Sequence, residues 1–240
     1  MRFYYFLYIN YAKLVPMNKF NEIQDISKNT YELSCENFEH DEIFRILEED
    51  EDYKKPIAIL NFDSLNIEDA EKLVFYLTNQ KGPTREAVSM VLAEFSPSIT
   101  ESMKMQIIDA LCDVNPNVCR NIIDYLKKTN SSILKDDILK RINEILLEID
   151  LECAKFRKNM EKNHILNKKI FHLYWCLEGL CCVIDENDSE VEKLLYKTAD
   201  FYDYTIREKT AQILNKIKNA PLSLIDKLKG DENFYVRNKF

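Results

Sequence analysis

The chain has 240 residues, a formal net charge of −8 and a hydrophobic content of 46%. Its 3 glycines and 6 prolines are too few for the turns of a β-rich fold, so we expect long helices joined by short turns. The acidic balance gives no general attraction to nucleic acid or to anionic membranes. Only residues 127–172 carry a basic excess, 11 Lys and Arg against 7 Asp and Glu, and mixed charges of this kind usually belong to solvated helix faces.

The N-terminal residues 1–16 differ from the rest of the chain because they are rich in aromatic residues. Their apolar run is too short to span a bilayer, and no small-residue cleavage site follows it. We therefore expect residues 1–16 to be an extension outside the main domain. Our hypothesis is that the native start is Met17, which N-terminal sequencing of protein made from its native gene would test.

Helical periodicity then follows in chain order. Phe38–Leu47 is typical of a short helix, and Pro56 suits the start of the next. Asn66 can cap a helix over residues 67–80, and Pro83 can open another that continues to Phe95. The next expected pair is Met103–Val114 with Asn117–Thr129.

The middle region, residues 131–184, departs from this short pattern. It predicts one long helix over residues 133–156 and a second over Ile165–Ile184, which is apolar on most sides and therefore buried on most sides. Shorter helices then resume, at Ser189–Phe201, Tyr204–Ile217 and Pro221–Lys229, and a last one begins at Asn233.

One short sequence recurs: Asp-x-Asn-x-x-Val occurs at Asp113–Val118 and again at Asp231–Val236. Asp203 followed by Ile206 and Arg207 is a related version. A motif that returns within a helical pattern is typical of stacked helical repeats. These residues, with the apolar runs after them, resemble the HEAT-like helical-repeat family over roughly residues 36–130 and 188–240.

The resemblance implies an all-α solenoid of about five to six antiparallel helix pairs, with irregular long helices in the middle. It also implies that residues 17–240 form a single domain. In that family the Asp and Arg form a ladder between neighbouring repeats, and the Val packs between the helices. The positions given a structural role in this way are Arg85, Asp113, Val118, Asp203, Arg207, Asp231, Val236 and Arg237. The first motif departs from the pattern, because Cys119 stands where Arg is expected and Arg120 follows it.

Catalytic signatures are weak. Gly-rich phosphate loops, nucleophile elbows and HExxH motifs are absent from the sequence. His172 and Cys176 have a spacing that metal ligands use, but no further ligands are evident, so we predict no metal and no cofactor. Trp175 and Glu178 are similar in composition to the Trp and acidic residue of a HEAT-like alkylpurine DNA glycosylase family. The alternative interpretation of Glu178 is a solvated residue or the partner of a Lys.

Seven cysteines without a CxxC pair indicate a reducing compartment, which favours a cytoplasmic location. We expect a noncatalytic scaffold that binds a partner protein or peptide on the concave face of the repeat stack. The acidic N-terminal half favours a basic partner. The contact candidates are Arg120, Asn121, Asp124, Lys209, Gln212 and Lys216. The alternative is a HEAT-like nucleic-acid-binding or DNA-repair enzyme that uses the basic middle region.

Overall fold

The computed structural model describes residues 20–155, 163–188 and 191–240, and within them the chain is helical and contains no β-strand. It divides into two compact units, residues 1–97 and 98–240, which we call the N-terminal unit and the C-terminal unit. Residues 1–16 and Met17, for which we expect an extension and a native start, lie outside the described residues.

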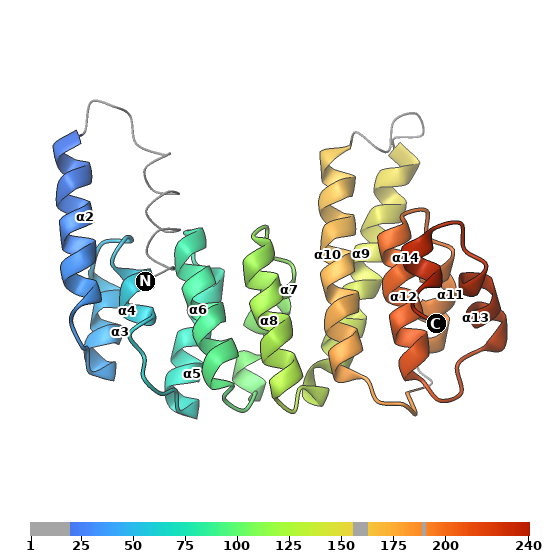
Figure 1. Ribbon diagram of the computed structural model, residues 1–240, viewed down its shortest axis with the longest axis horizontal. Coiled ribbons are helices and arrows are strands. Elements are labelled where there is room, and N and C mark those ends of the chain that lie inside the picture. The colour runs from blue at the N-terminus through green and yellow to red at the C-terminus, as the bar shows by residue number, and fades with distance from the viewer. Residues whose placement is uncertain (1–19, 156–162, 189–190) are drawn as a thin grey trace. The chain divides into compact units, whose positions relative to one another are not determined.

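In the described part of the N-terminal unit, residues 20–97, α4 packs against α2, α3 and α6 (Figure 1). Pro56 and Pro83 each lie in the first turn of a helix, where a missing N–H leaves no bond unmade. The elements are α2 (Phe20–Ser34), α3 (His40–Glu49), α4 (Lys55–Ile59), α5 (Ile67–Leu73), the 3₁₀ helix η2 (Val74–Thr78) and α6 (Gly82–Phe95).

The C-terminal unit consists of helices that pack as consecutive pairs: α7 with α8, α9 with α10, α11 with α12, and α13 with α14. The elements are η3 (Glu101–Met103), α7 (Lys104–Leu111), α8 (Pro116–Lys128), η4 (Ser132–Leu134), α9 (Lys135–Lys155), α10 (His164–Val183), α11 (Glu192–Ala199), α12 (Tyr204–Lys216), α13 (Leu222–Lys229) and α14 (Phe234–Arg237).

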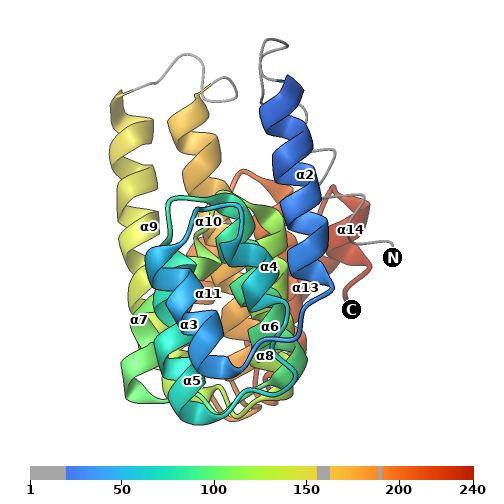
Figure 2. The same ribbon diagram turned by 90° about the vertical axis from the view of Figure 1, so that its left-hand side faces the viewer.

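Contacts between pairs follow one pattern in this unit. The second helices touch in the order α8, α10, α12 and α14, while α7 packs on α9 and α11 packs on α13. The long helices α9 and α10 stand side by side in both views (Figure 1 and Figure 2). The middle region therefore packs as one further helix pair between its neighbours in the C-terminal unit.

Close packing of α10 depends on Gly179. A Cβ at this position would lie 2.9 Å from Leu111 Cδ1 and 3.6 Å from Ile138 Cδ1. Leu111 of α7 and Ile138 of α9 are both fully buried. The missing side chain thus lets α10 approach α7 and α9 at once, and the apolar side chains that meet there are buried from water.

Most expected helices are present with ends shifted by a few residues, and the all-helical prediction is confirmed. Two differences are instructive. The expected helix over residues 67–80 changes to a 3₁₀ helix at Val74, and α2 forms where no helix was expected. Polar residues recur throughout the α2 sequence, so its pattern carries little helical signal.

Candidate functional site

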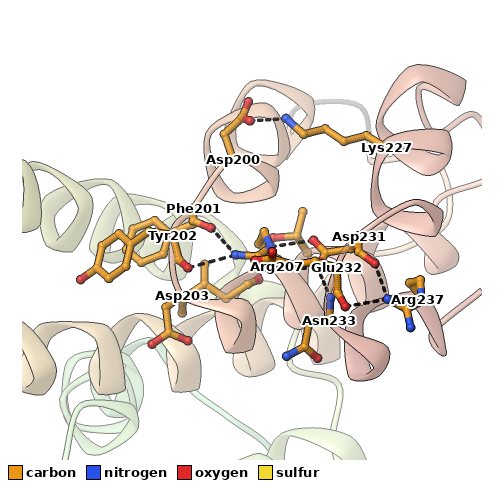
Figure 3. A network of polar contacts seen from close by, with 12 residues as sticks. Asp200, Phe201, Tyr202, Asp203, Arg207, Lys227, Asp231, Glu232, Asn233 and Arg237 are labelled. Atoms are coloured by element: carbon orange, nitrogen blue, oxygen red, sulfur yellow. Dashed lines mark hydrogen bonds and ion pairs between the residues drawn. The ribbon is translucent and has the colours of Figure 1, made fainter. Parts of the chain in front are cut away.

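The turn between α11 and α12 is held by Arg207. Its Nε and one terminal nitrogen donate to the two carboxylate oxygens of Asp231, at 2.7 and 3.1 Å, while the other terminal nitrogen donates to the carbonyl oxygens of Phe201 and Tyr202. Figure 3 shows Arg207 between these groups. Both side chains are about nine-tenths buried. A bidentate pair of this kind fixes the geometry of both partners, and it joins the start of α12 to the turn before α14.

The pair also shifts both ionisation equilibria. The hydrogen bonds from Arg207, together with the main-chain N–H of Asn233, outweigh burial and lower the pKa of Asp231. The hydrogen bond to Asp231 likewise raises the pKa of Arg207. Both groups therefore remain charged at neutral pH.

The same backward hydrogen bond recurs at equivalent helix starts. Arg85 donates to the carbonyl of Asn79, and Arg237 donates to the carbonyl of Asp231, in each case six residues back. Cys119 has the equivalent position, and its thiol lies 3.4 Å from the carbonyl oxygen of Asp113. In the first motif, Cys119 therefore replaces the arginine: its thiol can still donate to the Asp113 carbonyl, but the positive charge is lost.

Within the recurring motif, Asp and Asn have separate roles. Asp113 Oδ1 accepts from the N–H of Asn115, whose own side chain caps α8; Asp231 and Asn233 repeat both bonds at α14. Asp203 lies at the capping position of α12 and accepts from the N–H of Thr205. Such caps satisfy main-chain donors that a helix cannot satisfy itself. The apolar residue three positions after each cap, Val118, Ile206 or Val236, is fully buried.

The long helix α10 begins in the same way, which the sequence analysis missed. Asn163 caps α10 by accepting from the N–H groups of Ile165 and Leu166, and Leu166 is buried. The sequence signal for this helix start is the pattern Asn-x-x-Leu at Asn163–Leu166, a shortened form of the Asp-x-Asn-x-x-Val motif.

A pocket with a volume of about 560 Å³ opens beside the Arg207 network. Three segments line it: Asn167 and Ile170 of α10, the residues Tyr202, Asp203, Tyr204 and Arg207 at the start of α12, and Glu232 with Asn233 before α14. Aromatic rings continue beyond it, because Tyr204 stacks on Tyr235 with 6.2 Å between ring centroids. Both tyrosines are exposed. The pocket thus combines aromatic faces with the carboxylates of Asp203 and Glu232.

Glu178, the expected acid of the enzyme alternative, forms an ion pair with Lys209. The Lys209 ammonium lies 2.6 Å from a carboxylate oxygen of Glu178, 3.0 Å from Gln212 Oε1 and 4.7 Å above the ring of Tyr174. Lys209 is 6% exposed. Burial opposes the charge of Lys209, but the contacts with Glu178 and Tyr174 outweigh it and raise its pKa. Trp175 lies next to this group, edge-on to Phe171 and Tyr174.

Expected partner contacts occupy different environments. Arg120 and Asp124 are exposed on α8, where Arg120 donates to Asn117 and Asp124 pairs with Lys127, and Asn121 is half-buried. Lys216 is exposed on α12 and donates to the carbonyl of Cys181. Lys209 and Gln212 lie in the ion-pair group described above, where the Lys209 side chain is buried.

Several cations of the basic middle region are engaged in ion pairs. Lys135 pairs with Asp188 at 2.7 Å, and Lys169 pairs with Glu148. Arg141 approaches Glu144 at 3.4 Å. These carboxylates reduce the positive field that residues 127–172 could direct at a phosphate backbone.

Within the described ranges, no group of three or more His, Cys, Asp or Glu side chains is arranged to hold a metal ion. His172 is half-buried, and its partial burial, followed by the cations of Lys168 and Arg141, lowers its pKa to about 4. Among the described helices, none combines the length and the apolar character that crossing a membrane requires.

Comparisons with protein-family models, with curated proteins and with solved structures each found no match to this chain.

Proposed function

We propose that this chain is a noncatalytic binding protein whose helix pairs stack in the HEAT-like manner, and that it holds a peptide segment of a partner protein in the pocket beside Arg207. The observation that carries the proposal is the pocket itself. Its volume of about 560 Å³ is within the range of ligand-binding clefts. Its base is fixed by the bidentate Arg207–Asp231 pair, so the binding surface is organised before the partner arrives.

The partner segment presents a Lys or Arg side chain. Asp203 and Glu232 place carboxylates at the pocket, and the side chain of Glu232 is 91% exposed. The tyrosine faces of Tyr202 and Tyr204 attract the same cation through their π systems. Burial and the neighbouring negative charges raise the pKa of Tyr202 to about 12, so its hydroxyl keeps its proton at neutral pH.

The packing order α8, α10, α12 and α14 supports the stacked arrangement, since each second helix contacts the next. The Arg207–Asp231 pair supports it further, because it links one helix pair to the following pair. Stacked pairs bury an apolar face that one pair alone would expose. The proposal also includes secondary contacts at exposed positions of the second helices. These are Arg120 and Asp124 of α8 and Lys216 of α12.

A peptide-display selection against the full chain tests the proposal. We expect selected peptides to contain Lys or Arg, and calorimetry to show that Tyr202→Ala and Glu232→Lys each weaken binding about tenfold or more. Tyr196→Ala and Asp226→Lys are matched controls, because these exposed residues of α11 and α13 do not line the pocket. Selected peptides that bind both pocket variants as tightly as the unmodified chain would contradict the proposed site.

The nucleic-acid enzyme is the alternative. The Glu178–Lys209 ion pair argues against it, because a carboxylate engaged by a buried ammonium is not free to act as a base. Its test is retention of DNA at low salt with a steep loss as salt rises. DNA retention together with failure of the peptide selection would replace our proposal with that alternative.

A further inference from the structure

Two cysteines from separate helices meet inside the C-terminal unit. Cys112 directly follows the last residue of α7, Cys176 lies within α10, and their sulfur atoms are 3.5 Å apart. Both are free thiols in this structure. They are 64 residues apart in sequence, so the packing of α7 on α10 produces the approach.

The two thiols have different surroundings. Cys112 is half-buried, whereas Cys176 is 1% exposed. The guanidinium of Arg141, from α9, interacts with the Cys112 sulfur. Arg141 is charged at all physiological pH values and stabilises a thiolate beside it. Cys112 is thus the thiol that an oxidant reaches first, and the more deeply buried Cys176 is the thiol that can react with it afterwards.

Acid–base properties agree with this order. The hydrogen bond from Cys176, followed by the contact with Arg141, outweighs burial and lowers the pKa of Cys112 to about 7. Asp109, on the same helix as Cys112, disfavours the thiolate. Cys119 of α8 also lies near Cys112, and a Cys112 thiolate raises the pKa of Cys119. Cys176 is shifted in the opposite direction, because it donates to Cys112 and is fully buried, and its pKa is raised.

We propose that Cys112 and Cys176 form an oxidation site for hydroperoxides, at which Cys112 is the attacking thiol and Cys176 the resolving thiol that closes a disulfide between α7 and α10. This inference rests on the approach of the two thiols and on their surroundings, and it is independent of the peptide pocket.

The reaction balances in two steps. The Cys112 thiolate attacks one peroxide oxygen, so that an S–O bond forms, the O–O bond breaks, and the leaving alkoxide or hydroxide takes up a proton as alcohol or water. Cys112 is then a sulfenic acid. The Cys176 sulfur attacks the Cys112 sulfur, the S–S bond forms, the S–O bond breaks, and hydroxide leaves with the Cys176 proton as water. Two thiols are oxidised by two electrons, and one hydroperoxide is reduced.

The required movement is small. A disulfide has an S–S length of about 2.05 Å, so the sulfurs must approach by about 1.5 Å. The helix α7 ends at Leu111, and Cys112 therefore lies where the main chain is leaving the helix. A shift at a helix end disturbs fewer main-chain hydrogen bonds than a shift within the helix.

Neighbouring cysteines are not equivalent. The Cys119 thiol lies 3.5 Å from the carbonyl of Leu111 as well as 3.4 Å from that of Asp113, and burial raises its pKa to about 12. Cys182 contacts the carbonyl of Glu178, and burial raises its pKa to about 12 as well. Both remain protonated at neutral pH and are slow to react.

The test uses the reduced full-length chain. It is treated with one equivalent of hydrogen peroxide, the remaining thiols are blocked with iodoacetamide, and the cross-linked peptides are mapped by mass spectrometry. We expect a disulfide between Cys112 and Cys176, a product lighter by two hydrogen atoms, and a thermal unfolding midpoint raised by several degrees, since the bond closes a long loop. A disulfide between other cysteines, or oxidation of exposed Cys35 while Cys112 and Cys176 both remain thiols, would overturn the proposal.

Variants separate the two roles. In Cys176→Ala we expect Cys112 to remain a sulfenic acid that a 1,3-diketone reagent traps. In Arg141→Gln we expect the pH profile for alkylation of Cys112 to move to higher pH, with the rate at pH 7 reduced about fivefold or more. Cys153→Ala, at a half-exposed cysteine of α9, is the matched control and should leave the mapped disulfide unchanged. Cys112 alkylating no faster than Cys182 in the unmodified chain would also refute the assignment.

Discussion

At the scale of single residues, Arg207 and Arg237 make the same hydrogen bonds to the preceding turn but differ in what else they contact. Arg207 also binds both oxygens of a buried carboxylate, whereas Arg237 is exposed. A lysine can reproduce a contact with a carbonyl but not a planar two-point contact with a carboxylate. The two arginines therefore allow the pair with Asp231 to be separated from the turn itself.

Replacing Arg207 by Lys should lower the free energy of unfolding by about 2 kcal/mol, because Asp231 is left buried with an incomplete partner. Arg237→Lys removes the same type of residue at the same motif position and should have a much smaller effect. Urea unfolding followed by circular dichroism measures both. Equal losses in the two variants would show that the carbonyl contacts, and not the carboxylate pair, stabilise this region.

His40 in the N-terminal unit predicts a pH dependence of stability. Its Nδ1 lies 2.7 Å from buried Asp69 and its Nε2 3.5 Å from Asp63. Burial disfavours the protonated ring, but the hydrogen bonds to these carboxylates outweigh it and raise the pKa above 6.5. A raised folded-state pKa means that charged His40 stabilises the fold fully below about pH 6.5, the unfolded-state value, and that this contribution is lost as the pH rises through the folded-state value.

The variant His40→Gln should therefore be less stable than the unmodified chain at pH 6, and the difference should shrink by pH 8. Denaturant titrations at the two pH values measure it, and NMR titration of the His40 ring reports the pKa directly. Asp63→Asn, which removes the more distant carboxylate, should reduce the pH effect only in part. A stability difference that is the same at pH 6 and pH 8 would contradict the role given to His40.

Recurrence in the sequence singled out Arg207 and Asp231, and the structure places them in contact. It could not indicate Cys112 with Cys176, or Glu178 with Lys209. A repeated motif describes what is common to each turn, whereas these pairs depend on which helix packs on which, and in what register. Lys209 illustrates the difference: its helical position suggests a surface cation, but its ammonium lies over the ring of Tyr174 and pairs with the carboxylate of Glu178 in α10.

At the scale of helices, apolar periodicity and capping residues located most elements. The long helices α9 and α10 follow from an unbroken apolar stripe, and Asn66 caps α5 as its position suggests. The change from an α-helix to a 3₁₀ helix at Val74 could not be predicted from the apolar pattern, because both helix types place apolar side chains on one face. The α9–α10 pair departs from the short repeat in sequence because both helices are long, and the cap of α10, Asn163, lacks the preceding Asp-x of the recurring motif.

Gly179 provides the test at this scale. Gly179→Val inserts a branched side chain between α10, α7 and α9 where a single Cβ already meets Leu111, and should lower stability by about 2 kcal/mol or more. Gly82→Val is the matched control, because a Cβ at Gly82 meets nothing within 4 Å. Thermal unfolding of both variants measures the difference. Equal stability of the two variants would contradict the conclusion that Gly179 is needed for the close approach of α10 to α7.

At the scale of the whole molecule, the structural basis of the proposed function lies within the C-terminal unit. The pocket, the Arg207–Asp231 pair and the Glu178–Lys209 pair all fall within residues 98–240. This unit also has its own buried core, which runs from Ile107 of α7 to Val236 of α14. A segment with its own hydrophobic core is expected to fold alone.

We therefore predict that a fragment of residues 98–240 unfolds cooperatively on heating and binds the peptides selected with the full chain at unchanged affinity. A shorter fragment, residues 98–230, is the matched control. It lacks Asp231, Glu232 and Asn233, so Arg207 loses its carboxylate partner and the pocket loses one wall. Circular dichroism should show helix in both fragments, whereas calorimetry should show peptide binding only in the longer one. Binding by the shorter fragment would place the peptide elsewhere, and a longer fragment without a cooperative transition would show that the C-terminal unit needs residues 1–97 to fold.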